Sequence, residues 1–307
     1  MSALRLGTRG SALALAQSGS FAAALTAATG EPVELVEIVT DGDRSHAPVP
    51  QLGVGVFVFA LRDALHAKEV DFAVHSYKDL PTLPADGLTV AAIPVRDDPR
   101  DALISRDGAT LAELGSGARI GTGAPRRVAQ LLALGRGFEP QPLRGNVDTR
   151  LRKVTEGHLD AVVLAAAGLR RLGRAAEITE VLDPMLMLPA PAQGALAVEC
   201  RTADTSLVEL LASLDDEHTR AAVVAERSLL ATLEAGCSAP VAALADVAED
   251  PDGAWELYLR GAVFSPDGSF AVRLSATGAL TDASGVGARL AAELLAEGAD
   301  HVLGEHA

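Results

Sequence analysis

The stretch LPAPAQGALAVEC (188–200) decides the fold of this chain. Before it, strand-like runs alternate with helix-like runs in two successive segments, and this order indicates mainly parallel sheets covered by helices. The proline-rich LPAPAQG (188–194) indicates a crossing between two lobes, whereas GALAVEC (194–200) predicts one buried strand that is too short to begin a new lobe. We therefore expect the chain to return here to its first lobe.

Working outward, the two segments predict similar lobes. The predicted strands of the first lobe are 4–8, 33–40, 71–76 and 88–94, with helices at 11–28 and 57–67. The second repeats the order with strands at 118–122 and 160–165, a helix after Pro125 and a helix at 146–156. The acidic DDPRD (97–101) marks the first crossing. The expected fold class is α/β, with two periplasmic-binding-protein-like (type II) lobes and two hinge crossings, and ligands usually bind in the cleft between such lobes.

A smaller α+β domain is expected to follow. A long helical pattern covers 218–235, strand patterns cover 255–264 and 269–278, and a helix pattern covers 283–298. The predicted domains are a discontinuous first lobe, a cationic second lobe and a C-terminal domain: 1–96 with 194–214, 97–193, and 215–307.

The charge of the chain is uneven. Its 307 residues carry 26 Lys plus Arg against 41 Asp plus Glu, a formal charge of −15, which argues against nucleic acid as a partner. Residues 1–99 hold 7 basic and 12 acidic residues, residues 100–188 hold 13 and 10, and residues 189–307 hold 6 and 19. Clustered arginines in the cationic middle third suit carboxylates or phosphates, which a guanidinium fork can grip.

The location follows from other features. Only two cysteines occur, which fits a reducing compartment, and Arg5 and Arg9 interrupt the apolar N-terminal run that a signal peptide would need. No stretch is apolar enough over about 18 residues to suggest a membrane span. We expect a cytoplasmic protein with no membrane partner.

Four segments could carry chemistry: TRGS (8–11), HSYKDLP (75–81), GTGAPRR (121–127) with LRGNVDTRL (143–151), and LEAGCSAP (233–240). The first and third place Gly, Arg or Ser at predicted helix starts, where backbone N–H groups favour anions. HSYKDLP places Lys78 and Asp79 after a strand, where Asp79 could stabilise a developing cation. Neither a Walker loop nor a Rossmann glycine pattern occurs, and no Cys or His spacing suggests a metal site. Cys237 in its Gly-Cys-Ser loop is the better candidate for a reactive thiol, whereas Cys200 resembles a buried filler.

Taken in order along nearly the full length, these segments resemble the porphobilinogen deaminase (hydroxymethylbilane synthase) family. The matching motifs are TR-x-S-x-LAL-x-Q, T-x-GD (40–43), HS-x-KD-x-P, DPRDA (98–102), GT-x-x-x-RR, LRGNV-x-TRL, LA-x-AGL-x-RLG (164–173), LPA-x-x-QGA (188–195), EC-R and LE-x-GC. Each motif alone could arise by chance, but this number in this order is highly specific.

The resemblance implies a transferase of tetrapyrrole (heme, porphyrin) biosynthesis. Such an enzyme joins four porphobilinogen units head to tail, releases ammonia at each step and finally releases hydroxymethylbilane. It also implies a dipyrromethane cofactor held by a thioether to Cys237, with Asp79 as the catalytic carboxylate. The implied partner is porphobilinogen, and the family suggests a cytoplasmic monomer without a metal.

The resemblance further implies which residues bind the cofactor and the substrate. Those matching the cofactor-binding positions are Ser76, Lys78, Asp79, Thr122, Arg126, Arg127, Arg144, Gly145 and Cys237. Those matching the substrate-binding positions are Arg9, Ser11, Phe57, Arg144, Arg150, Arg171 and Gln193. The chain departs from the family at Gly123 and Ala124, where GTSSLRR usually has serines, and near 48–58, where lysines are usual.

Two alternatives stay open at this point. A non-catalytic solute-binding protein would also have two α/β lobes with two crossings, although such proteins are typically exported and need neither the Gly-Cys loop nor a third domain. A family member that has lost activity through its departures at 48–58 and 123–124 is the other. Release of ammonia from porphobilinogen distinguishes both alternatives from an active enzyme.

Overall fold

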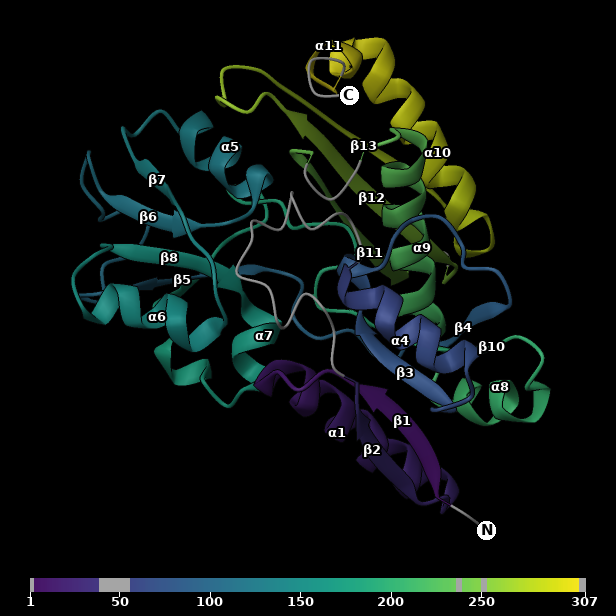
Figure 1. The fold of residues 1–307 in the computed structure, drawn as a ribbon. Coiled ribbons are helices and arrows are strands. Elements are labelled where there is room, and N and C mark those ends of the chain that lie inside the picture. The colour runs from purple at the N-terminus through teal and green to yellow at the C-terminus, as the bar shows by residue number, and fades with distance from the viewer. Residues whose placement is uncertain (1–2, 39–55, 236–238, 250–252, 304–307) are drawn as a thin grey trace. The chain divides into compact units, whose positions relative to one another are not determined.

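The computed structural model describes residues 3–38, 56–235, 239–249 and 253–303 (Figure 1). The chain divides into two compact units. Unit 1 comprises Met1–Asp97 with Ala195–Arg220, and unit 2 comprises Asp98–Gly194 with Ala221–Ala307. The chain therefore crosses between units after Asp97, after Gly194 and after Arg220.

Unit 1 is built on a five-stranded sheet with the order β2-β1-β3-β10-β4. Its strands are β1 (Leu4–Thr8), β2 (Val33–Glu37), β3 (Phe72–Ser76), β4 (Leu88–Ala92) and β10 (Leu196–Arg201). Strand β1 is parallel to both β2 and β3, whereas β10 is antiparallel to β3 and β4. The strand predicted at 194–200 is therefore confirmed as β10, and it lies inside the first sheet.

The helices of unit 1 are α1 (Ala12–Thr29), α4 (Val56–His66), the 3-10 helix η1 (Tyr77–Asp79) and α8 (Thr205–Ala212). Ser11 caps α1 by accepting a hydrogen bond from the amide of Ala14, and Gly30 ends it with a φ of 77°. The expectation that no stretch of about 18 residues is apolar enough to span a membrane is wrong for α1, which could cross one by length and composition alone. Here it connects parallel strands β1 and β2, with Phe21 packed edge-on against Phe72 of β3, which is the position of a crossover helix.

Unit 2 contains a second five-stranded sheet, with the order β7-β6-β8-β5-β9. Its strands are β5 (Asp101–Ser105), β6 (Arg119–Thr122), β7 (Glu139–Pro142), β8 (Ala161–Ala165) and β9 (Glu180–Val181). The pattern of the first sheet recurs, because β6 is parallel to β7 and β8 while β5 is antiparallel to β8. In each sheet the antiparallel fourth strand is the one that directly follows a crossing, which is the topology expected of a chain that leaves one lobe and returns to it.

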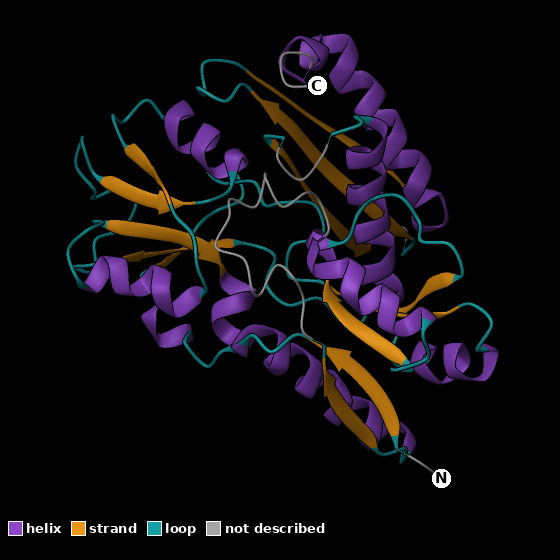
Figure 2. Ribbon diagram, viewed as in Figure 1, coloured by secondary structure: helices purple, strands orange, loops and turns teal. Residues whose placement is uncertain are grey.

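Helices α5 (Pro125–Ala133), α6 (Val147–Thr155), α7 (Ala166–Arg171) and η2 (Ala175–Glu177) accompany this second sheet. The rest of unit 2 contains an antiparallel sheet of β11 (Val241–Glu249), β12 (Trp255–Phe264) and β13 (Ala271–Ala279). Helix α9 (Glu217–Thr232) and α10 (Ala283–Leu294) lie side by side against this sheet (Figure 2), and their core includes Ala225, Leu229 and Leu290. The chain continues through η3 (Leu280–Asp282) before α10, and through the π-helical turn Leu295–Ala299 and α11 (Asp300–Leu303) after it.

The predicted fold class is confirmed: two α/β sheets are followed by a smaller α+β part. The predicted division into three domains is more detailed than the division into two compact units. Its bounds of 1–96 with 194–214, 97–193 and 215–307 stay a prediction.

Candidate functional site

In unit 1 the predicted site residues lie at one edge of the sheet. Arg9 and Ser11 follow β1, and Ser76 ends β3, the parallel neighbour of β1. The two strands therefore end at the same edge, where Gln17 of α1 donates a hydrogen bond of 2.9 Å from Nε2 to Oγ of Ser76. Arg9 and Ser11 are half-buried. The hydroxyl oxygen of Ser11 accepts the helix-capping hydrogen bond, and its O–H can still donate.

Lys78 and Asp79 lie on η1, directly after β3. Tyr77 fixes the start of this turn, because its side chain is buried and its amide donates to the carbonyl oxygen of Ala195 at 3.0 Å. Lys78 is half-buried and Asp79 is exposed. The turn thus rests on a buried residue while the carboxylate of Asp79 faces solvent.

A buried charged network lies next to this turn, and the sequence analysis did not single it out. His75 of β3 places Nε2 3.4 Å from Oε2 of Glu199 on β10. Glu199 also accepts from Arg62 of α4, with 2.9 Å between Nη2 and Oε1. Burial raises the pKa of Glu199, but the nearby His75 and the hydrogen bonds and charge of Arg62 lower it by more, so the net pKa lies below its ordinary value. In the sequence, the feature that could have indicated this network is the histidine that precedes Ser76 in the HS motif.

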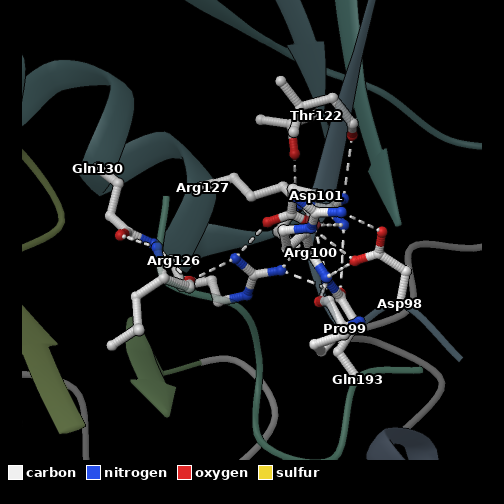
Figure 3. Close-up of polar contacts among 12 residues, drawn as sticks. Asp98, Pro99, Arg100, Asp101, Thr122, Arg126, Arg127, Gln130 and Gln193 are labelled. Carbon is white, nitrogen blue, oxygen red and sulfur yellow. Dashed lines mark hydrogen bonds and ion pairs between the residues drawn. The ribbon is translucent and has the colours of Figure 1, made fainter. Parts of the chain in front are cut away.

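In unit 2, Arg126 and Arg127 occupy the first turn of α5 after Pro125, and both are buried. Figure 3 shows both side chains directed at Asp101, the first residue of β5. Arg126 donates from Nη1 to Oδ2 at 2.7 Å and from Nη2 to Oδ1 at 3.1 Å. Arg127 donates to Oδ1 from Nη2 at 2.7 Å and from Nε at 3.1 Å. One fully buried carboxylate therefore holds two guanidinium groups.

Gln193, just before the second crossing, completes this cluster. Its Nε2 donates to Oδ1 of Asp101 at 2.8 Å and to the carbonyl oxygen of Pro99 at 2.7 Å. Its Oε1 accepts from Nη2 of Arg126 at 3.1 Å. Two of the chain's crossing segments are thus joined to each other on the unit 2 side by side-chain hydrogen bonds.

The electrostatics of this cluster are unbalanced towards positive charge. Burial raises the pKa of Asp101, but the charges and hydrogen bonds of Arg126 and Arg127 lower it well below its ordinary value, so Asp101 is ionised. One carboxylate against two guanidinium groups gives a net charge of +1. Burial and then the charge of Arg127 lower the pKa of Arg150, which indicates that a third cation lies near the pair. Such an excess of buried positive charge favours a bound anion.

The LRGNV segment contributes further groups in unit 2. Gly145 has a φ of 95°, a conformation that glycine adopts without strain, and its carbonyl oxygen accepts from Nε of Arg150 at 2.8 Å. Asn146 caps α6 by accepting from the amide of Thr149. Arg144 is exposed. A Cβ on Gly123 would lie 2.6 Å from the carbonyl oxygen of Leu143, so the glycine at this departure from the family motif permits close contact with this segment.

The remaining predicted site residues of unit 2 lie in different parts of its fold. Thr122 is buried at the end of β6, with Oγ1 accepting from the amide of Ala124. Arg171 donates to the carbonyl oxygen of Gly194 at 2.6 Å. The neighbouring arginines are paired with carboxylates, Arg170 with Asp98 at 2.9 Å and Arg174 with Glu177. The clustered arginines of the middle third therefore differ in their partners, because some donate to backbone carbonyl oxygens and others pair with carboxylates.

Cys237 and the segment 39–55 lie outside the described residues, and Phe57 is described only as part of the backbone of α4. Cys200 is fully buried on β10, which confirms the prediction of a buried cysteine, and burial raises its pKa to about 11. Across the described part of the chain, no group of three His, Cys, Asp or Glu side chains could hold a metal ion.

Two family models match the chain. "Porphobilinogen deaminase, dipyromethane cofactor binding domain" matches residues 4–209, and "Porphobilinogen deaminase, C-terminal domain" matches residues 220–296. The porphobilinogen deaminase of Nocardia farcinica is 60% identical over 306 residues, covering 98% of this chain and 88% of its own. Porphobilinogen deaminase 1 of Streptomyces coelicolor is 59% identical over 314 residues, covering 99% and 98%. The porphobilinogen deaminase of Mycobacterium tuberculosis H37Rv is 59% identical over 304 residues, covering 98% of each chain.

Proposed function

Because the chain belongs to the porphobilinogen deaminase family, we propose that it is a transferase that condenses four porphobilinogen units, releases one ammonia per unit and then releases hydroxymethylbilane by hydrolysis with one water. The family assignment also makes a dipyrromethane group its cofactor. Within this proposal the protein acts in the cytoplasm as a monomer. The catalytic and binding roles of the residues below belong to the same proposal.

One observation in the structure carries the proposal: two buried arginines share a single carboxylate in unit 2. Each pyrrole of the proposed cofactor and substrate carries an acetate and a propionate, so a site for them must neutralise several carboxylates. The net charge of +1 around Asp101, with Arg150 close to Arg127, supplies positive charge that no described carboxylate in the cluster balances. The donor set of this unit therefore fits a polycarboxylate group.

The dipyrromethane group, when bound, supplies the pyrrole carbon to which the first porphobilinogen is joined. The residues that would hold it are Ser76, Lys78, Asp79, Thr122, Arg126, Arg127, Arg144 and Gly145. We assign its covalent attachment to Cys237. Arg9, Ser11, Phe57, Arg150, Arg171 and Gln193 would bind the substrate, together with Arg144.

Asp79 is the proposed catalytic residue. When the C–N bond of the protonated aminomethyl group of porphobilinogen breaks, ammonia leaves with the electron pair and positive charge develops on the pyrrole that remains. A carboxylate within reach stabilises that charge and can accept a hydrogen bond from the pyrrole N–H. Asp79 is exposed on η1, in the same turn as buried Tyr77, and an exposed position suits a group that must contact a ligand.

The solute-binding alternative and the inactive-member alternative are tested by one assay. The purified chain is incubated with porphobilinogen, and free ammonia and the linear tetrapyrrole are measured together. The proposal predicts four molecules of ammonia for each tetrapyrrole. Reversible binding of porphobilinogen without ammonia release would instead support a binding protein or a family member without activity.

A further inference from the structure

Asp101 is the member of the buried arginine cluster to which the proposed function assigns no role. Asp101 is fully buried and accepts hydrogen bonds from Arg126, Arg127 and Gln193. It is 25 residues from Arg126 in sequence and reaches it only because β5 lies in the same sheet as β6, the strand that leads into α5.

Asp101 and three neighbouring acceptors together engage most of the N–H donors of both arginines. A guanidinium group has five N–H donors. Arg126 uses four of them, two on Asp101, one on the carbonyl oxygen of Leu188 at 2.9 Å and one on Gln193. Arg127 also uses four, two on Asp101, one on the carbonyl oxygen of Val163 at 3.0 Å and one, at 3.5 Å, on Gln193. Each arginine therefore keeps at most one N–H for a ligand.

Stability alone does not account for this arrangement. Two cations buried beside one anion leave a charge that burial makes unfavourable, and a buried ion pair is often no more stable than apolar side chains of the same size. Both arginines also lie in the first turn of α5, where the helix dipole disfavours positive charge. The excess charge is explained if the cluster serves an anion.

We propose that Asp101 is the positioning residue for the arginine pair: it holds both guanidinium forks, with Gln193, so that the pair meets an anionic ligand with one net positive charge and at most one N–H from each arginine. This inference rests on the proposed function, because the ligand would be the carboxylate-bearing pyrrole groups. Gln193 of the second crossing segment also donates to the carbonyl oxygen of Pro99 in the first, so hydrogen bonds connect both crossing segments to the arginine pair.

The direction in which one substitution changes ligand binding distinguishes a positioning role from a purely electrostatic one. Asp101→Asn keeps the shape of the side chain and removes its charge, which raises the net charge of the cluster from +1 to +2. If charge alone governed ligand capture, this variant would bind an anion more tightly. If Asp101 positions the arginines, the variant binds more weakly despite its extra positive charge. Asp101→Glu keeps the charge but moves the carboxylate by one methylene, so only a positioning role predicts an effect.

The test is loading of the full-length apoprotein with porphobilinogen, measured by intact mass spectrometry as the fraction of chains that carry the adduct. We expect both variants to need a porphobilinogen concentration higher by about tenfold or more for half-loading, the scale at which loss of an orienting partner weakens a ligand-binding side chain. The matched control is Asp160→Asn, which removes a carboxylate paired with Arg119 and Arg106 in the same unit, outside the proposed site. It should load at the wild-type concentration, and thermal melting checks that each variant is folded.

Several outcomes would overturn the inference. One is half-loading of Asp101→Asn at or below the wild-type concentration, and another is wild-type loading of Asp101→Glu. If neither variant folds, Asp101 is a folding residue and the inference is wrong. If the wild-type chain itself acquires no adduct, the proposed function fails, and that result is distinct from loading that is equal in wild type and variants.

Discussion

Asp79 is the residue on which the proposed chemistry depends most. Its side chain is exposed and lies on a three-residue turn, so its packing contributes little to the stability of unit 1. The residues just before it in the chain are buried: Tyr77 donates from its amide to the carbonyl oxygen of Ala195, and His75 lies beside Glu199. Activity and stability should therefore respond to different residues here.

Substituting Asp79 should separate the two. Asp79→Asn is expected to lower the rate of ammonia release by about a hundredfold or more, because a neutral amide cannot stabilise the developing cation as a carboxylate does. The melting temperature should stay within about 1 °C of wild type, since exposed substitutions usually have small effects. Asp86→Asn, an exposed carboxylate on the loop that follows, is the matched control and should change neither value. A rate for Asp79→Asn equal to that of the control would remove Asp79 from its role.

Glu199 should govern stability and its dependence on pH. Its pKa is lowered in the folded chain, so it contributes stability above the pKa of an unfolded glutamate, about 4.3, and this contribution is lost as pH falls through the lower folded value. Glu199→Gln leaves Arg62 without its carboxylate and should lower the free energy of unfolding at pH 7 by about 3 kcal/mol.

The measurement is urea unfolding between pH 7 and pH 3. The difference between wild type and Glu199→Gln should shrink as pH falls below about 5, because wild type loses the contribution that the variant never had. Glu209→Gln, an exposed carboxylate on α8, is the control and should follow wild type throughout. A difference that grows as the solution is acidified would contradict the assigned direction.

At the level of elements, the hydrophobic patterns predicted most of the α/β strands and the strand that returns to the first sheet. Strand β12 was predicted at its observed bounds, because LYLRGAVF carries β-branched and aromatic residues. Strand β11 was missed because VAALADVAE is rich in alanine and favours no strand by itself; its nine-residue pairing with β12 determines its structure. Similarly, the sequence indicated Arg126 and Arg127 but not Asp101, since only the strand order of the sheet brings that carboxylate to them.

The packing of α9 against α10 depends on a glycine. A Cβ on Gly287 would overlap the carbonyl oxygen of Ala225 and lie 2.8 Å from Cβ of Ser228. Gly287→Ala should therefore destabilise the chain by about 1–3 kcal/mol despite the better helix propensity of alanine. Gly19→Ala in α1 is the matched control, since its Cβ would meet nothing within 4 Å, and it should stabilise the chain by about 0.5–1 kcal/mol. Urea unfolding of both variants checks these opposite signs, and stabilisation by Gly287→Ala would show that the helices can move apart at little cost.

Over the whole molecule, the formal charge of −15 conceals a local reversal of sign. Acidic residues predominate at the two ends of the sequence, whereas the middle third is cationic and contains the buried arginine pair. A net negative charge promotes solubility, and a local positive site can still attract an anionic ligand over a short distance. The overall charge thus says nothing against a polycarboxylate ligand.

The central claim is that this chain carries a dipyrromethane group on Cys237 and builds the tetrapyrrole from it. Intact mass spectrometry of the purified chain, produced in cells that make porphobilinogen, tests this most directly. The account predicts that wild type and Cys200→Ala are each heavier than the sequence mass by one dipyrromethane group, and that Cys237→Ser has the mass of the bare chain. A folded wild-type chain without the added mass, or a Cys237→Ser variant that retains it, would contradict the account.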